Sequence, residues 1–448
     1  MSVFKQQLKG LERYFFRCPN SNLITVARIK GAISSEQLET ALFRLKRKYP
    51  LLGVKVSLDK GNIAWLTSEG VPEHLVRSEP RAANDPEAWI RKVSEEQKES
   101  FEFDKGPLVR FTLLNSGESS DLIINCHHGI CDALSLTYLI RDLLSAIANP
   151  EWEPEPSLCP NDTENKVLPS PRIDPFHKVM MKLLNALWKR SRVSFSEADY
   201  HTLHRKYWGK AKSNQTLSWG LTECETSALV NRCRKENVTV NSAIATAMVA
   251  AQQEVQGTRL AYQNTVSMPV DFRKRLSPPA GEAFGLYVST VKADLSYARG
   301  TSFWPNVRRI HERIKRRLTD RSVFMMPRKA NMLHPSLMDA VYFSKYGLLN
   351  SRIASLILGL AGIRRMNAGW EISNLGRCDL PVDYGSLKLE SIIVPVFLSD
   401  YQEKCLRIVT VGGKMSFSLT FWEDILDTLT AERIRDTSMR YLCEASGW

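Results

Sequence analysis

Apolar and polar positions along the first third of the chain predict alternating strands and helices. Ser34 begins a Ser-x-x-Gln capping box with Gln37, and apolar residues then recur at helical spacing until Pro50 ends the helix. Residues 86–100 form a second, more polar helical pattern. Short apolar runs predict strands at residues 52–56, 108–114 and 122–126. We expect the first part of the chain to be an α/β layer.

A proline-rich, acidic segment at about residues 150–175 follows this layer. It contains seven of the 21 prolines, a composition that extends the backbone and disfavours packing. We therefore expect two domains, residues 1–165 and 166–448, joined by this linker. Beyond it, the pattern predicts strands at 216–220, 260–270, 387–396, 406–412 and 415–421, and helices after the capping residue Thr222, at 240–253 and at 430–444.

Length and composition indicate a folded cytoplasmic protein. With 448 residues and 43% apolar content the chain can bury large cores. The longest nearly apolar run, residues 353–363, is about half of what a membrane-spanning helix needs, and the N-terminus has no apolar signal region. Nine cysteines with no CxxC pair favour free thiols over a zinc ribbon or a disulfide framework.

The net charge of +13 indicates an anionic partner, such as nucleic acid, the phosphates of coenzyme A or an acidic carrier protein. We expect no nucleic-acid binding, because no recognisable motif accompanies the charge. Two basic stretches stand out, one along a predicted helix at residues 308–321 and one at 178–192, where lysines flank methionines, leucines and Trp188. Each is interpreted as a solvated helix face or as a docking surface for a carrier protein or coenzyme A. The second could also rest on an anionic membrane.

The stretch from Ile123 to Ala133 carries the candidate chemistry. An apolar strand leads into His127 and His128, a turn follows at Gly129, and Asp132 stands where an apolar helix begins. Side chains alternate along a strand, so the two histidines cannot both face one cavity. Only one of them can act as a base.

Three interpretations of this stretch are open. In the first, Asp132 caps the helix and both histidines are satisfied core groups. In the second, the histidines bind a metal, although no third ligand is evident at a suitable spacing. In the third, a near-neutral imidazole is held so that it takes a proton from a nucleophile.

The stretch resembles the HHxxxDG motif of the condensation-domain and chloramphenicol-acetyltransferase-like superfamily of acyltransferases. Further similarity covers nearly the whole chain in the same order. It includes residues 22–52, the segment from Val266 to Arg273 followed by 284–288, the Ser-Asn-Leu-Gly sequence at 373–376 and the predicted hairpin at 413–419. The closest likeness is to free-standing condensation-like enzymes and alcohol acyltransferases.

This resemblance implies an α/β (α+β) fold of two chloramphenicol-acetyltransferase-like halves in a V, with an active-site tunnel between them. It implies a site of His127, His128 and Asp132, in which His128 is the general base and Asp132 forms a structural ion pair with Arg273. Ser373 and Asn374 would line the tunnel or donate a hydrogen bond to an oxyanion. For Asn374, a turn residue before Gly376 is an equally open interpretation.

The implied reaction moves an acyl group from an acyl-CoA or acyl-carrier-protein thioester to a small-molecule alcohol or amine. We expect no tightly bound cofactor, no metal and no need for more than a monomer; contact with a membrane surface is left open. Ala133 departs from the family pattern, because condensation domains usually carry glycine there. The alternative is a catalytically lapsed condensation-like module that recruits a carrier protein.

Overall fold

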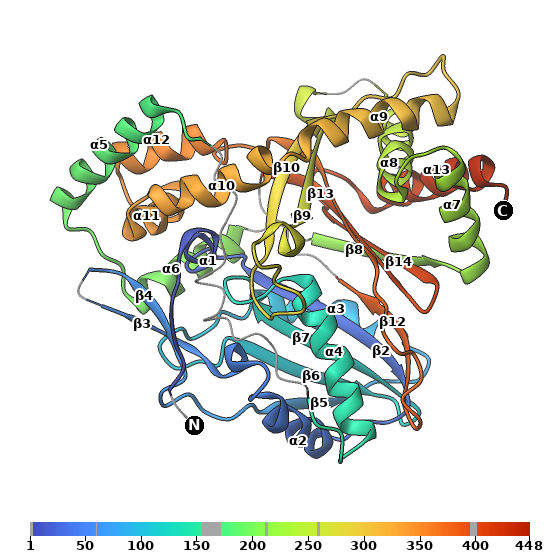
Figure 1. The fold of residues 1–448 in the computed structure, drawn as a ribbon, viewed down its shortest axis with the longest axis horizontal. Coiled ribbons are helices and arrows are strands. Elements are labelled where there is room, and N and C mark those ends of the chain that lie inside the picture. Colours follow the sequence, from blue (N-terminus) through green and yellow to red (C-terminus); the bar gives the residue numbers. More distant parts are fainter. Residues whose placement is uncertain (1–2, 60, 155–171, 211–213, 258–259, 395–400) are drawn as a thin grey trace.

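The computed structural model describes residues 3–59, 61–154, 172–210, 214–257, 260–394 and 401–448. The described strands form a sheet of five, a sheet of six and a small sheet of three. Helices flank the two larger sheets, which lie in separate lobes (Figure 1). The predicted mixed α/β class with two halves is therefore confirmed. The centre of the predicted linker, residues 155–171, and the boundary at 165/166 lie outside the described residues.

The first lobe is built on the five-stranded sheet, in the order β12-β2-β7-β6-β5. Side chains alternate along β7, so that Ile124 packs on one face and Ile123 on the other. Both faces are therefore covered by helices, α2 and α4 on one side and α3 on the other. The elements are β12 (Lys388–Ile393), β2 (Asn22–Lys30), β7 (Ser119–His127), β6 (Val109–Asn115), β5 (Val76–Pro80), α2 (Ser35–Leu45), α3 (Ala88–Lys98) and α4 (Ala133–Ala148).

One strand of this lobe comes from late in the chain. β12 pairs antiparallel with β2, with Leu389 opposite Ile29 and Ile393 opposite Val26. Leu389 is buried in the core of the first lobe. The polypeptide thus crosses between the lobes, and the lobes are not two strictly consecutive pieces of sequence.

The second lobe contains the six-stranded sheet, in the order β10-β9-β11-β13-β14-β8. Trp370 and Ile372 of β11 pack in the core beneath four helices, so Glu371 between them faces the opposite side. By the same alternation Arg407 of β13 faces that side. The elements are β8 (Asn214–Leu221), β9 (Thr265–Asp271), β10 (Val288–Asp294), β11 (Ala368–Arg377), β13 (Gln402–Val411), β14 (Lys414–Trp422), α7 (Glu223–Lys235), α8 (Val240–Gln256), α9 (Phe303–Arg317) and α13 (Thr428–Ser446).

Further helices occupy one end of the molecule (Figure 1). Side chains of α5, α11 and α12 share a small core that includes Trp188, Leu337 and Ile357. Arg13 of α1 forms a buried ion pair with both carboxylate oxygens of Asp339 on α11. The remaining elements are α1 (Gly10–Phe15), α5 (Pro175–Ser191), α6 (Glu197–Lys210), α10 (Asp320–Met332), α11 (Pro335–Lys345), α12 (Arg352–Ala361) and the small sheet of β1 (Lys5–Gln7), β4 (Ala64–Thr67) and β3 (Lys55–Leu58).

Most predicted elements occur close to their expected positions, but some bounds were wrong. Residues 50–53 form a 3-10 helix where the predicted strand at 52–56 should begin. Residues 261–264 also form a 3-10 helix, so β9 begins only at Thr265. The predicted basic helix is two helices, because the Thr319 hydroxyl accepts a hydrogen bond from the Ser322 amide and starts a new one. The strand predicted at 387–396 ends at Ile393, and residues 395–396 lie outside the described part.

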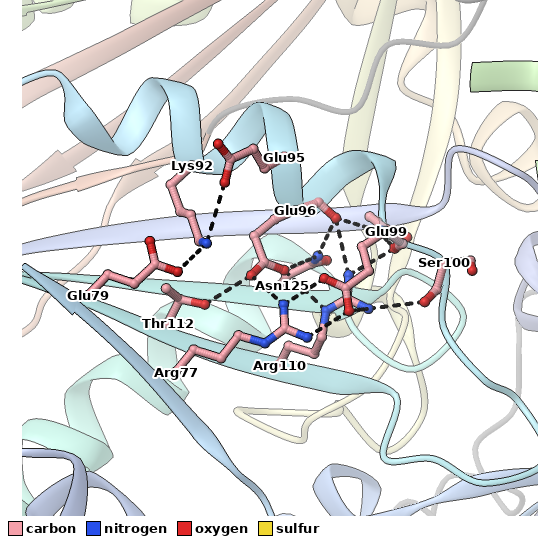
Figure 2. A network of polar contacts seen from close by, with 11 residues as sticks. Arg77, Glu79, Lys92, Glu95, Glu96, Glu99, Ser100, Arg110, Thr112 and Asn125 are labelled. Atoms are coloured by element: carbon pink, nitrogen blue, oxygen red, sulfur yellow. Dashed lines mark hydrogen bonds and ion pairs between the residues drawn. The ribbon is translucent and has the colours of Figure 1, made fainter. Parts of the chain in front are cut away.

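A buried carboxylate fixes α3 on the sheet of the first lobe, as Figure 2 shows. Glu96 is 2% exposed. It accepts hydrogen bonds from Thr112 Oγ1 at 3.0 Å, Arg110 Nε at 3.1 Å and Asn125 Nδ2 at 3.1 Å. Asn125 lies on β7 two residues before His127, so this contact fixes the strand that carries both histidines.

Replacing Glu96 with alanine should destabilise the protein strongly, because it leaves the Arg110 guanidinium and the Asn125 amide without this carboxylate. We expect a loss of about 3–5 kcal/mol in the free energy of unfolding, measured by urea denaturation. The matched control is Glu95→Ala on the same helix, an exposed residue in a surface ion pair with Lys92, which should cost less than about 1 kcal/mol. Equal losses for the two variants would contradict this role of Glu96.

Candidate active site

A cavity between the two lobes has His128 in its wall. It has a free volume of about 170 Å³ and takes lining residues from α1, the start of α4, β9, β10, β11 and β13. These include Phe15, Ala133, Asp271, Ser289 and Tyr401. The lining includes His128, which is 8% exposed, and Met326, which is 38% exposed. The cavity therefore extends from the buried imidazole toward the surface, and the methyl group of Ala133 occupies part of its wall.

The hydrogen bond of His128 defines which nitrogen can act as a base. Its Nδ1 lies 2.8 Å from the backbone carbonyl oxygen of Cys131. A carbonyl only accepts, so Nδ1 carries the proton and Nε2 carries the lone pair. The ring also packs against Phe15, with ring centroids 4.3 Å apart. The imidazole is thus held in one tautomer and one orientation.

Burial lowers the pKa of His128 below its usual value near 6.5. The carbonyl of Cys131 and the charge of Asp132 oppose this shift, and the positive charge of Arg407 adds to it. The net effect keeps the ring neutral at pH 7. A neutral imidazole is the form that accepts a proton.

His127 has a different environment and does not line the cavity. Its Nδ1 accepts a hydrogen bond from the Gly129 amide at 3.1 Å, so its protonated Nε2 donates to Ser21 Oγ at 2.9 Å. Burial lowers the pKa of His127 to about 3. The ring is packed edge-on against Phe103. His127 is therefore placed to hold the turn at residues 127–129, and we keep only His128 as the candidate base.

Asp132 and Arg273 form a buried ion pair between the lobes. Arg273 Nη1 lies 2.8 Å from Asp132 Oδ2, and Nη2 lies 2.8 Å from Oδ1. Asp132 also caps α4, since Oδ1 accepts from the Ser135 amide at 2.9 Å, and Oδ2 accepts from the Tyr287 amide at 2.9 Å. The carboxylate of Asp132 therefore both caps α4 and forms the ion pair with Arg273.

The environment of this pair favours its charged form. Burial alone would raise the pKa of Asp132, but the charge and hydrogen bonds of Arg273 and the two backbone amides bring it below the usual value. Arg273 also contacts Asp271 Oδ1 at 2.7 Å and lies over the ring of Tyr287. Asp132 begins the helix that follows the His128 turn, so the pair fixes that turn against the second lobe.

Ser373 and Asn374 are brought to the same cavity. Asn374 Oδ1 accepts a hydrogen bond from the Gly376 amide at 2.8 Å, as expected for a turn residue. With its oxygen used in this way, the amide group of Asn374 has Nδ2 as its donor. Asn374 is therefore both a turn residue and part of the cavity lining.

Two further charged residues line the cavity that sequence reasoning missed. Glu371 of β11 and Arg407 of β13 form an ion pair, and both side chains are at least nine-tenths buried. The Arg407 charge is close enough to His128 to lower the pKa of the imidazole. A charged residue flanked by apolar ones, Glu371 between Trp370 and Ile372 and Arg407 between Leu406 and Ile408, was the available signal, because a charge in a buried strand needs a partner.

The described residues contain no group of three or more metal-ligating side chains that could hold an ion. Nor does any described helix have the length and apolar character needed to cross a bilayer. Burial raises the pKa of the Cys131 thiol, the cysteine nearest to the turn after the histidines, well above its usual value. A thiol in that state is a poor nucleophile.

Removing either partner of the buried pair should destabilise the protein, because the remaining charge is left without its counter-charge. We expect Asp132→Ala and Arg273→Ala each to cost about 3–5 kcal/mol in the free energy of unfolding. The double variant should cost clearly less than the sum of the two. Thermal or urea unfolding of the four proteins measures this cycle, and additive losses would show that the pair is not coupled.

Comparison with known families matches the two parts of the chain separately. Residues 11–159 match the Condensation domain model, and residues 212–351 match the phthiocerol/phthiodiolone dimycocerosyl transferase C-terminus model. A linear gramicidin synthase of Brevibacillus parabrevis is 28% identical over 150 residues, 32% of this chain and 3% of that protein. Nonribosomal peptide synthetase tcpP of Claviceps purpurea (strain 20.1) is 22% identical over 64% of this chain and 13% of that protein. The chain therefore spans only a small part of these long relatives.

Solved structures share the fold over nearly the whole chain. The TRI3 trichothecene 15-O-acetyltransferase of Fusarium sporotrichioides has a TM-score of 0.65 at 11% identity, covering 99% of this chain and 96% of that one. The first condensation domain of the calcium-dependent antibiotic synthetase has a TM-score of 0.66 at 14% identity, with 99% and 96% covered. Polyketide synthase associated protein 5 of Mycobacterium tuberculosis has a TM-score of 0.59 at 12% identity, with 98% and 100% covered. The chain therefore matches a condensation-domain model in one part and an acyltransferase C-terminus model in another, and it shares the two-lobe fold of condensation domains and of TRI3.

Proposed function

We propose that the protein transfers an acyl group from a thioester to an alcohol or amine by direct attack, with His128 as the general base. The observation that carries this proposal is the hydrogen bond from His128 Nδ1 to the Cys131 carbonyl, which directs the basic Nε2 lone pair to the other side of a ring that lines the cavity. His127 is also held in one tautomer, but its ring does not line the cavity, whereas that of His128 does. One matched family model is that of a transferase, and TRI3, which shares the fold, is an O-acetyltransferase, which adds support for acyl transfer.

The proposed step needs no group beyond donor and acceptor. His128 Nε2 takes the proton of the acceptor O–H or N–H as its oxygen or nitrogen bonds to the thioester carbonyl carbon. The tetrahedral oxyanion then collapses, the carbon–sulfur bond breaks, and the leaving thiolate takes the proton from the imidazolium. The base ends neutral, and the products are an ester or amide and a free thiol.

The cavity wall supplies candidates to stabilise the oxyanion. Nδ2 of Asn374 is an amide donor, and Arg407 contributes a guanidinium that is already paired with Glu371. Fixed donors in a buried site stabilise developing charge more strongly than water does. The proposed donor is acyl-CoA or a phosphopantetheinyl carrier protein, and the acceptor is a small molecule with a hydroxyl or amino group.

His128→Ala should keep the fold and lower turnover by about two to four orders of magnitude, the usual contribution of a positioned base. Thiol release from a panel of acyl-CoA and acyl-carrier donors, with and without alcohol or amine acceptors, measures this. The control is His177→Ala, a partly exposed histidine on α5 outside the cavity lining, which should keep full turnover. Full activity in His128→Ala would refute the assignment. The absence of acceptor-dependent release with every donor would favour a lapsed module.

The pH dependence of kcat/KM should show its acidic limb below pH 6.5. Burial lowers the pKa of His128, so the base stays unprotonated as the pH falls past the usual histidine range and is lost only at a lower pH. Initial rates with one donor–acceptor pair between about pH 4 and pH 9 give the midpoint. A midpoint at or above 6.5 would contradict a buried imidazole as the titrating group.

A further inference from the structure

Helix α5 carries a stripe of large apolar side chains that is exposed to solvent and not buried. Phe176, Val179, Leu183 and Leu187 recur at helical spacing and are 72%, 66%, 58% and 40% exposed. The side chains that pack α5 onto the protein are different ones, including Leu184 and Trp188. Trp188 is not part of this stripe, because its ring is buried and its Nε1 donates a hydrogen bond to Ser336 Oγ at 2.9 Å.

Helix α12 adds exposed apolar residues at the same end of the molecule. Leu356 and Leu360 are 49% and 54% exposed, and Ile357 of the same helix packs in the small core shared with α5. Figure 1 shows α5 and α12 together at the outer end of the helical group. Of the sixteen exposed large apolar residues in the described part of the chain, six lie on these two helices. This concentration is unusual for a surface that faces only water.

Apart from Asp174, which caps the start of α5, the charges along these two helices are positive. Residues 175–192 and 351–366 contain no aspartate or glutamate. They contain Lys178, Lys182, Lys189, Arg190, Arg192, Arg352, Arg364 and Arg365. Lys178, Lys182 and Lys189 lie along the side of α5 next to the apolar stripe, and all three are exposed.

We infer that α5 and α12 form a docking surface for an anionic lipid membrane. An apolar stripe beside a basic one on a single helix is the pattern of helices that lie in the membrane interface, where apolar side chains enter the acyl boundary and lysines meet anionic headgroups. An acidic protein partner would be attracted by the same charge, but it does not require four bulky apolar side chains to stand in water along three turns. Docking to an anionic membrane accounts for both the exposed apolar side chains and the lysines next to them on α5.

The small core beneath the docking surface reaches the cavity. Tyr401 lines the cavity and also packs against the small core beneath α5 and α12. Met326 of α10, another cavity residue, is exposed, and Asn185 of α5 donates a hydrogen bond to the Met332 carbonyl on the same α10 at 2.7 Å. The helices that carry the docking surface therefore pack on residues that also build one side of the cavity.

Vesicle co-sedimentation of the full chain tests this surface without an activity assay. The wild type should sediment with phosphatidylcholine vesicles that contain phosphatidylglycerol and not with phosphatidylcholine alone. Binding should disappear at about 1 M salt, where the Debye length is about 3 Å. The double variants Phe176→Ser/Leu183→Ser and Lys178→Glu/Lys182→Glu should each weaken binding by at least about tenfold.

Matched controls change the same residue types elsewhere. Phe43→Ser/Leu429→Ser removes two apolar residues that are 65% and 67% exposed on α2 and α13, and Lys315→Glu/Arg316→Glu reverses two exposed charges on α9. These variants and His128→Ala should bind vesicles like the wild type, so a failure of the proposed catalysis leaves this test intact. Melting temperatures confirm that each variant is folded.

Three results would overturn the inference. The first is a wild type that does not bind the anionic vesicles. The second is an equal loss of binding in the α2/α13 or α9 controls, which would reflect general charge or stickiness. The third is a loss of affinity for an acidic acyl carrier protein in the α5 variants without any vesicle binding, which would assign the surface to a protein partner.

Discussion

The contact between Asp132 and Arg273 is the constraint on which the arrangement of the site depends. It joins the residue before α4 to a 3-10 turn that follows β9, across the boundary between the lobes, with two hydrogen bonds of 2.8 Å. A buried ion pair of this kind adds little stability relative to apolar packing, but it permits only one geometry. Because the same carboxylate also accepts the Ser135 and Tyr287 amides, the start of α4 and the second lobe cannot shift independently. The turn that carries His128 is thereby fixed in front of the cavity.

The two adjacent histidines have different surroundings, because the backbone directs their side chains to opposite sides. Alternation at the end of β7 sends the His127 ring toward Phe103 and Ser21, while His128 turns into the cavity wall. Burial lowers the pKa of both rings, but their hydrogen bonds leave different nitrogens protonated. His127 donates from Nε2 into the protein, whereas His128 donates from Nδ1 to the backbone. Only the second arrangement leaves the distal nitrogen as a base.

Local sequence signals predicted much of the fold, but contacts between residues far apart in the sequence were harder to predict. The Ser34 and Thr222 capping boxes and the strand leading to His127 follow from nearest-neighbour chemistry, and they occur as expected. The Asp132–Arg273 pair was expected only from the family resemblance. The addition of β12 to the first sheet and the pairing of Glu371 with Arg407 depend on register between strands far apart in sequence, which no local pattern encodes. Likewise, α5 was predicted to be amphipathic, but which of its apolar sides packs inward was decided by the position of α11.

Charged residues are paired in the cavity, whereas positive charge is in excess on part of the surface. Around His128 each arginine has an acidic partner, Arg273 with Asp132 and Asp271, and Arg407 with Glu371. The cavity therefore carries no excess of positive charge, and a neutral base there is not disturbed by an unpaired cation. The net positive charge of the chain, +13, must therefore come from residues outside the cavity. The acid-free segments 175–192 and 351–366 contain eight of its lysines and arginines. The proposed membrane docking and the proposed proton transfer thus involve different parts of the molecule, so strong attraction at the surface would not alter the pKa of the His128 base.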